Sequence, residues 1–129
     1  KINTGTSPAK IIALGKKELA VINEWEYAFN NQSAIVVFDR FDYSMKRSIR
    51  VEGGLFDGVL SHSKKYMYIT DPVRDRVSFI NIAAREKVFE LEMKGYTPKK
   101  LSVSADGKSL YVSAQNAKKI VIIDLKDMQ

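Results

Sequence analysis

Two short segments of this 129-residue chain carry the side chains with the most potential for chemistry. The first, Asp71-Pro72-Val73-Arg74-Asp75-Arg76, sets two carboxylates beside two guanidinium groups. Such a loop could hold an anion or a cation, or it could simply pair with itself. Two carboxylates are too few oxygen ligands for calcium, so we predict no metal site. Asp71 and Arg74 remain candidate ligand-binding or partner-binding residues.

The second segment holds the only tryptophan of the chain. Within residues 23–32, Trp25, Tyr27 and Phe29 occupy alternate positions, which predicts a hairpin extension with one aromatic face. Rigid aromatic side chains are common anchors in binding surfaces. The same three residues could instead pack on neighbouring protein. We expect them to form a partner surface or a packing contact.

Catalytic chemistry has little support in the remaining sequence. Cysteine is absent, and His62, the sole histidine, falls in a polar turn, where we expect it to be exposed to solvent. No Gly-x-Ser-x-Gly motif, phosphate-binding loop or dinucleotide motif occurs, and Gly53-Gly54 fits a turn. We predict no catalytic residue and no cofactor, and the sequence favours a non-catalytic protein over an enzyme.

The elements that must position these segments repeat along the chain. Leu110-Tyr111-Val112-Ser113 and Ile120-Val121-Ile122-Ile123-Asp124 return 43 positions earlier as Met67-Tyr68-Ile69-Thr70 and Val77-Ser78-Phe79-Ile80-Asn81. A weaker third copy lies near the N-terminal end. Repeats of about 40–45 residues with strand-like content are typical of β-propeller blades. We therefore predict an all-β fold.

Each repeat reads as four antiparallel strands, called a, b, c and d in chain order. The a–b turn of the last repeat contains Asp106-Gly107, a strong hairpin signal. Strand c of that repeat, Ile120–Ile123, is apolar throughout, and we expect burial on both faces. In the first repeat, b to c takes sixteen positions (Leu19 to Ile35) against ten in the others, because it contains the aromatic insertion.

The strands sum to about three blades, in the order d-abcd-abcd-abc. Blade 1 covers about 8–54, blade 2 about 55–97 and blade 3 about 98–129, and residues 1–5 resemble the end of a strand d. Three blades are too few for a closed ring, since propellers have four to eight. Either further blades of a longer chain or a second copy must complete the ring. We favour the longer chain.

The composition limits the classes of partner that we expect. The net charge of +6 arises from scattered lysine pairs with acidic residues between them, which favours a solvated surface over nucleic-acid binding. No apolar run approaches the ~20 residues of a membrane span, so we expect no transmembrane segment.

The stretch Ser102–Ser113, followed by a polar loop and a Val/Ile-rich strand ending at Asp124, resembles the YVTN-type β-propeller repeat of surface-layer-like and periplasmic proteins. The resemblance spans essentially the whole chain and weakens toward the first repeat. It implies an extracytoplasmic setting and no single activity. We expect a non-catalytic interaction or scaffold propeller that binds a partner on the face of the b–c loops. The alternative is a portion of a propeller enzyme, such as a periplasmic redox enzyme, lyase or lactonase, with its catalytic groups elsewhere.

Overall fold

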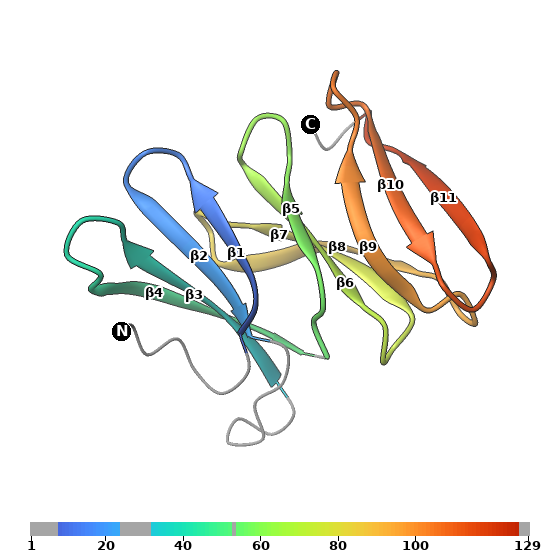
Figure 1. The fold of residues 1–129 in the computed structure, drawn as a ribbon, viewed down its shortest axis with the longest axis horizontal. Coiled ribbons are helices and arrows are strands. Elements are labelled where there is room, and N and C mark those ends of the chain that lie inside the picture. Colours follow the sequence, from blue (N-terminus) through green and yellow to red (C-terminus); the bar gives the residue numbers. More distant parts are fainter. Residues whose placement is uncertain (1–7, 24–31, 53, 127–129) are drawn as a thin grey trace.

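The computed structural model describes residues 8–23, 32–52 and 54–126, which form eleven β-strands and no helix. The strands build three antiparallel sheets that lie side by side in chain order (Figure 1). Each sheet is one blade, so the all-β, three-blade prediction is confirmed.

Blades 1 and 2 have four strands each, paired in chain order as predicted. Blade 1 consists of β1 (Pro8–Leu14), β2 (Glu18–Asn23), β3 (Gln32–Asp39) and β4 (Met45–Glu52). Blade 2 consists of β5 (Gly58–Leu60), β6 (Tyr66–Asp71), β7 (Arg76–Asn81) and β8 (Glu86–Glu92).

Blade 3 has three strands among the described residues: β9 (Pro98–Val103), β10 (Ser109–Ala114) and β11 (Lys119–Asp124). Its order, β11-β10-β9, leaves the outer edge of β11 without a paired strand in the described part of the chain. The expectation that residues 1–5 supply a strand d lies outside the described residues.

The a–b turns owe their shape to local side chains and to left-handed backbone positions. In blade 3 the Asp106 carboxylate accepts hydrogen bonds from the Ser104 hydroxyl (2.7 Å) and the Lys108 amide (2.9 Å). Gly107 has a φ of +75°, which glycine adopts without a steric penalty. Lys64 takes the equivalent place in blade 2 with a φ of +65°, although lysine favours that region far less.

The strand registers define equivalent positions in the three blades. Tyr68 lies opposite Val59 and Phe79, just as Tyr111 lies opposite Ser102 and Ile122. In blade 1, Ala20 lies between Ile12 and Val37 in the same way. Blades 1 and 2 also share a register shift at the same place, between Val37 and Phe38 and between Phe79 and Ile80.

Two apolar clusters hold the blades together, one at each blade–blade interface. The first packs Ile22, Ile35 and Val37 of blade 1 against Met67 and Ile69 of blade 2. The second joins blades 2 and 3; its buried members are Tyr68, Val77, Phe79, Met93, Leu101, Leu110, Val112 and Leu125. Burial between sheets thus provides most of the apolar stabilisation, as sheet-on-sheet packing requires.

The prediction that strand c of blade 3 is buried on both faces is wrong. Val121 and Ile123 pack against the second cluster, but Ile120 and Ile122 are 65% and 66% exposed. The reason is that these two side chains point to the side of blade 3 that faces away from blade 2. An all-apolar strand therefore has one covered face and one open face.

Candidate functional site

Four equivalent positions in each blade face the next blade along the chain. In blade 1 they are Ala20, Ile22, Ile35 and Val37, and in blade 2 they are Tyr68, Thr70, Val77 and Phe79; all eight are at most 2% exposed. In blade 3 they are Tyr111, Ser113, Ile120 and Ile122, which we call the open face of blade 3. Here Tyr111 is 38% exposed and the two isoleucines about two-thirds exposed.

A hollow of about 550 Å³ adjoins the open face at its b–c end. Phe56, from the segment before β5, forms part of its wall. The other lining residues come from blade 3: Lys99, Lys100, Ser113, Ala114, Gln115, Lys118, Lys119 and Ile120. The lining contains four lysines and no acidic residue.

None of these four lysines forms an ion pair with a described residue. The Nζ atoms of Lys99 and Lys100 lie 4.5 and 5.1 Å from the centroid of the Phe56 ring. The ring face attracts cations, and it holds both ammonium groups at the wall of the hollow. The hollow is therefore strongly electropositive without internal neutralisation.

The same region of blade 2 is filled by residues 95–101, the segment that enters blade 3. The Asp75 carboxylate accepts hydrogen bonds from the amides of Gly95 (2.9 Å) and Thr97 (3.1 Å). The Asp57 carboxylate accepts one from the Leu101 amide (2.9 Å), and the Thr70 hydroxyl donates one to the Lys99 carbonyl (2.7 Å). Two carboxylates and a hydroxyl of blade 2 thus hold the segment that enters blade 3.

The predicted binding residues of the Asp71 loop lie at different depths. Asp71 is fully buried, and its carboxylate accepts hydrogen bonds from the amides of Gly54 and Arg74 and from the Arg76 guanidinium. Arg74 is exposed at the tip of the turn. Burial lowers the pKa of Arg76, but the carboxylates of Glu90 and Asp71 outweigh it and leave that pKa raised. The Asp71 carboxylate is thus engaged within the loop, and Arg74 alone of the pair is presented outward.

Trp25, Tyr27 and Phe29 lie outside the described residues, so their role stays a prediction. His62 is exposed in the a–b turn of blade 2, as expected. It contacts the neighbouring turn closely: a Cβ added at Gly107 would lie 2.4 Å from the His62 Cβ.

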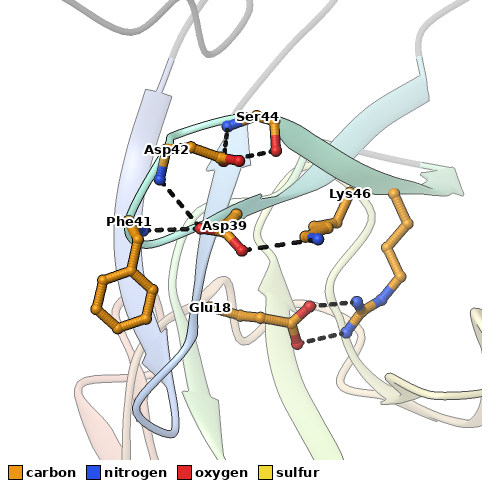
Figure 2. A network of polar contacts seen from close by, with 7 residues as sticks. Glu18, Asp39, Phe41, Asp42, Ser44 and Lys46 are labelled. Atoms are coloured by element: carbon orange, nitrogen blue, oxygen red, sulfur yellow. Dashed lines mark hydrogen bonds and ion pairs between the residues drawn. The ribbon is translucent and has the colours of Figure 1, made fainter.

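Figure 2 shows a second polar cluster, at the c–d turn of blade 1. The Asp39 carboxylate accepts hydrogen bonds from the amides of Phe41 and Asp42, and Arg47 binds both oxygens of Glu18 (2.8 and 3.2 Å). This hydrogen-bonded guanidinium lowers the pKa of Glu18. These contacts shape the turn and leave the Phe41 ring projecting, 75% exposed.

Sequence reasoning missed the lysine-lined hollow. The pairs Lys99-Lys100 and Lys118-Lys119 were interpreted as solvated surface. The signal that could have found them is the 43-residue offset, because it aligns Lys100 with Asp57 and Lys118 with Asp75. Two positions that carry carboxylates in one blade carry ammonium groups in the next.

Within the described ranges, no group of three or more acidic, histidine or cysteine side chains is arranged to hold a metal ion. A search of the same ranges finds no helix long and apolar enough to cross a membrane.

Comparison with known proteins supports the fold. No protein-family model matches the sequence, and no curated protein does. Among solved structures, hydrazine synthase of Kuenenia stuttgartiensis is similar with a TM-score of 0.78 and 19% identity, over 99% of this chain and 35% of that one.

A putative 6-phosphogluconolactonase of Bacteroides fragilis matches with a TM-score of 0.72 and 22% identity, over 93% of this chain and 35% of that one. The Swd1 β-propeller domain of Myceliophteria thermophila matches at 0.67 and 14%, over 88% and 36%. Identities this low carry the fold alone, and the chain spans about a third of each of these proteins. The chain is a β-propeller of about three blades that covers part of the ring of its structural neighbours.

Proposed function

We propose that this chain is a non-catalytic interaction and scaffold unit whose open face on blade 3 binds another polypeptide. One observation carries the proposal. The four positions that blade 3 covers on blade 2 are uncovered on blade 3 itself, where Tyr111, Ile120 and Ile122 expose apolar surface. Apolar side chains clustered on one sheet face are typical of a protein interface.

The polar groups next to the open face lie at its b–c end. The lysine-lined hollow opens there, and the exposed Arg74 lies in the corresponding b–c turn of blade 2. We also propose an extracytoplasmic setting, because the segment Ser102–Ser113 resembles the YVTN-type repeat. The alternative, a portion of a propeller enzyme, gains nothing from the neighbours, since their low identity carries no activity to this chain.

The absence of cysteine allows a direct test. A cysteine placed at Ile122, at its buried equivalent Phe79, or at the half-exposed Val88 is then the only thiol in the chain. In the chain alone, a maleimide reagent should modify Ile122→Cys and Val88→Cys quickly and Phe79→Cys slowly. In the native assembly, purified from its source, Ile122→Cys should become protected while Val88→Cys stays reactive. Equal reactivity of Ile122→Cys in both preparations would refute the interface.

A further inference from the structure

The charges around the open face identify the chemistry of the polypeptide that covers it. We propose that its occupant is a segment that enters as the next blade and places a carboxylate beside Lys100, and that a second copy of this chain is not that occupant. This inference rests on the proposed interface and specifies its partner. It follows from comparing one position in three blades.

Lys10, Asp57 and Lys100 occupy that position. The strand registers make Ile12, Val59 and Ser102 equivalent, because each pairs with the same position of strand b in its own blade. Lys10, Asp57 and Lys100 each come two residues before these and are therefore equivalent to one another. The charge at this position is positive in blade 1, negative in blade 2 and positive in blade 3. Lys10 lies on β1, Asp57 just before β5 and Lys100 on β9, in each case near the b–c end of strand a.

The step from blade 1 to blade 2 shows what a lysine at this position requires. The Lys10 ammonium lies 3.3 Å from Oδ1 of Asp57, whose side chain is 4% exposed. That oxygen accepts no hydrogen bond from a described residue, so Lys10 is its counter-ion. A buried carboxylate needs such a partner, because an unpaired buried charge is strongly destabilising. A lysine in one blade is thus matched by an acid in the blade that follows.

The hydrogen-bond acceptors that hold an incoming segment on blade 2 are replaced by donors on blade 3. Asp57 and Asp75 accept backbone amide hydrogens from the segment entering blade 3. Their equivalents, Lys100 and Lys118, are donors only and cannot accept these hydrogens. The segment that covers blade 3 must instead offer carboxylate or carbonyl oxygens to two ammonium groups.

A second copy of the chain does not meet this requirement. Its first blade would bring Lys10 to the place beside Lys100, where the two ammonium groups repel each other. Its net charge of +6 adds to the repulsion at low salt. A further blade with an acid at this position meets the same geometry with attraction.

A covalently appended blade tests the proposal without depending on affinity. Residues 83–126 can be appended after Leu125, because residue 82 and residue 125 are equivalent; the extension supplies a strand d and a fourth blade. Two versions carry either lysine or aspartate at the appended copy of Lys100. Each is made with Lys100 and with Lys100→Asp in the original chain, and Ile122→Cys reports docking in all four.

With Lys100 present, the appended aspartate should raise Tm by about 2–4 °C over the appended lysine, which corresponds to ~1 kcal/mol in a chain of this size. With Lys100→Asp, the order should reverse. The matched control, Lys108→Asp in the appended copy, lies in an a–b turn at the other edge and should not depend on residue 100. Protection of Ile122→Cys without the reversal would overturn the charge inference and leave the interface standing. Reactive Ile122→Cys in all four chains would overturn the interface itself.

Self-association of the 129-residue chain provides a second measurement. The double variant Lys100→Asp, Lys118→Asp restores the carboxylates of blade 2 and should associate with itself at least several-fold more tightly than the natural chain in sedimentation equilibrium at low salt. Tighter association of the natural chain would overturn the exclusion of a second copy.

Discussion

The hydroxyl of Thr70 donates a 2.7 Å hydrogen bond to the carbonyl of Lys99, and this bond ties strand b of one blade to strand a of the next. Thr70 is fully buried, so water cannot replace the bond. Thr70→Val keeps the shape and removes the hydroxyl, which also accepts a hydrogen bond from the Asp57 amide (3.1 Å). We expect it to lower the free energy of unfolding by about 1–3 kcal/mol in urea titrations. Thr70→Ser keeps the hydroxyl and should cost less; an equal loss in both variants would assign the effect to packing.

Two isoleucines that face the next blade, one on the covered face of blade 1 and one on the open face of blade 3, provide a comparison. Ile22 is fully buried between blades 1 and 2, whereas Ile122 is 66% exposed. Ile22→Ala should destabilise the chain by about 2–5 kcal/mol, since it leaves a cavity in the first cluster. Ile122→Ala should change stability by less than about 0.5 kcal/mol. A large loss in the Ile122 variant would mean that the open face is covered in the isolated chain.

The contact between the turns of blades 2 and 3 predicts unequal costs for two glycine substitutions. Gly95 and Gly107 have φ values of +82° and +75°, so alanine is strained at both, by about 1–3 kcal/mol. A Cβ at Gly95 meets nothing within 4 Å, whereas one at Gly107 meets His62. Gly107→Ala should therefore lower Tm more than Gly95→Ala. Adding His62→Gly should recover the difference, and no recovery would place the clash elsewhere.

The Glu18–Arg47 pair predicts a pH dependence of stability. Arg47 lowers the pKa of Glu18 below its usual value of 4.5, so the folded state binds this proton less readily than the unfolded state. The pair therefore stabilises the fold above the unfolded pKa, and the contribution is lost as pH falls through the folded pKa. Glu18→Gln should cost about 1 kcal/mol at pH 7. That cost should shrink as the pH falls below 4.5, and a cost that stays constant in acid would contradict the linkage. The exposed Glu86→Gln variant is the control.

Much of the fold could be predicted from the sequence because apolar and polar residues alternate with the period of the strands. Eleven of the twelve strands in the predicted order d-abcd-abcd-abc are present among the described residues, and the twelfth, in residues 1–5, lies outside them. In strand d of blade 2 the sequence leaves the phase open, because Val88 and Phe89 are adjacent and both apolar. The register shift beside Phe79 explains this, since Phe79 pairs with Phe89 and Ile80 with Lys87, so Val88 has no partner.

The candidate site was harder to predict because it depends on neighbours that alternation does not encode. Ile120 and Val77 read alike as apolar strand residues, yet one is open and the other covered. Likewise Asp75 reads as a loop acid, and its role in fastening Gly95 and Thr97 depends on contacts twenty residues away. The 43-residue offset aligns lysines of blade 3 with these acids, but the hydrogen bonds of blade 2 are needed to show what the replacement removes.

The two apolar clusters have a consequence for how the chain opens. Among the described residues each cluster joins two neighbouring blades, so stability is distributed as in a one-dimensional array of coupled units. Blade 2 is held by a cluster on each side, through Met67 and Ile69 on one and Tyr68 and Phe79 on the other. Amide hydrogens of β6 and β7 should thus exchange most slowly, and those of β11 fastest among the strands of blades 2 and 3. We therefore expect blade 3 to open before blade 2, and a polypeptide docked on the open face should slow that opening.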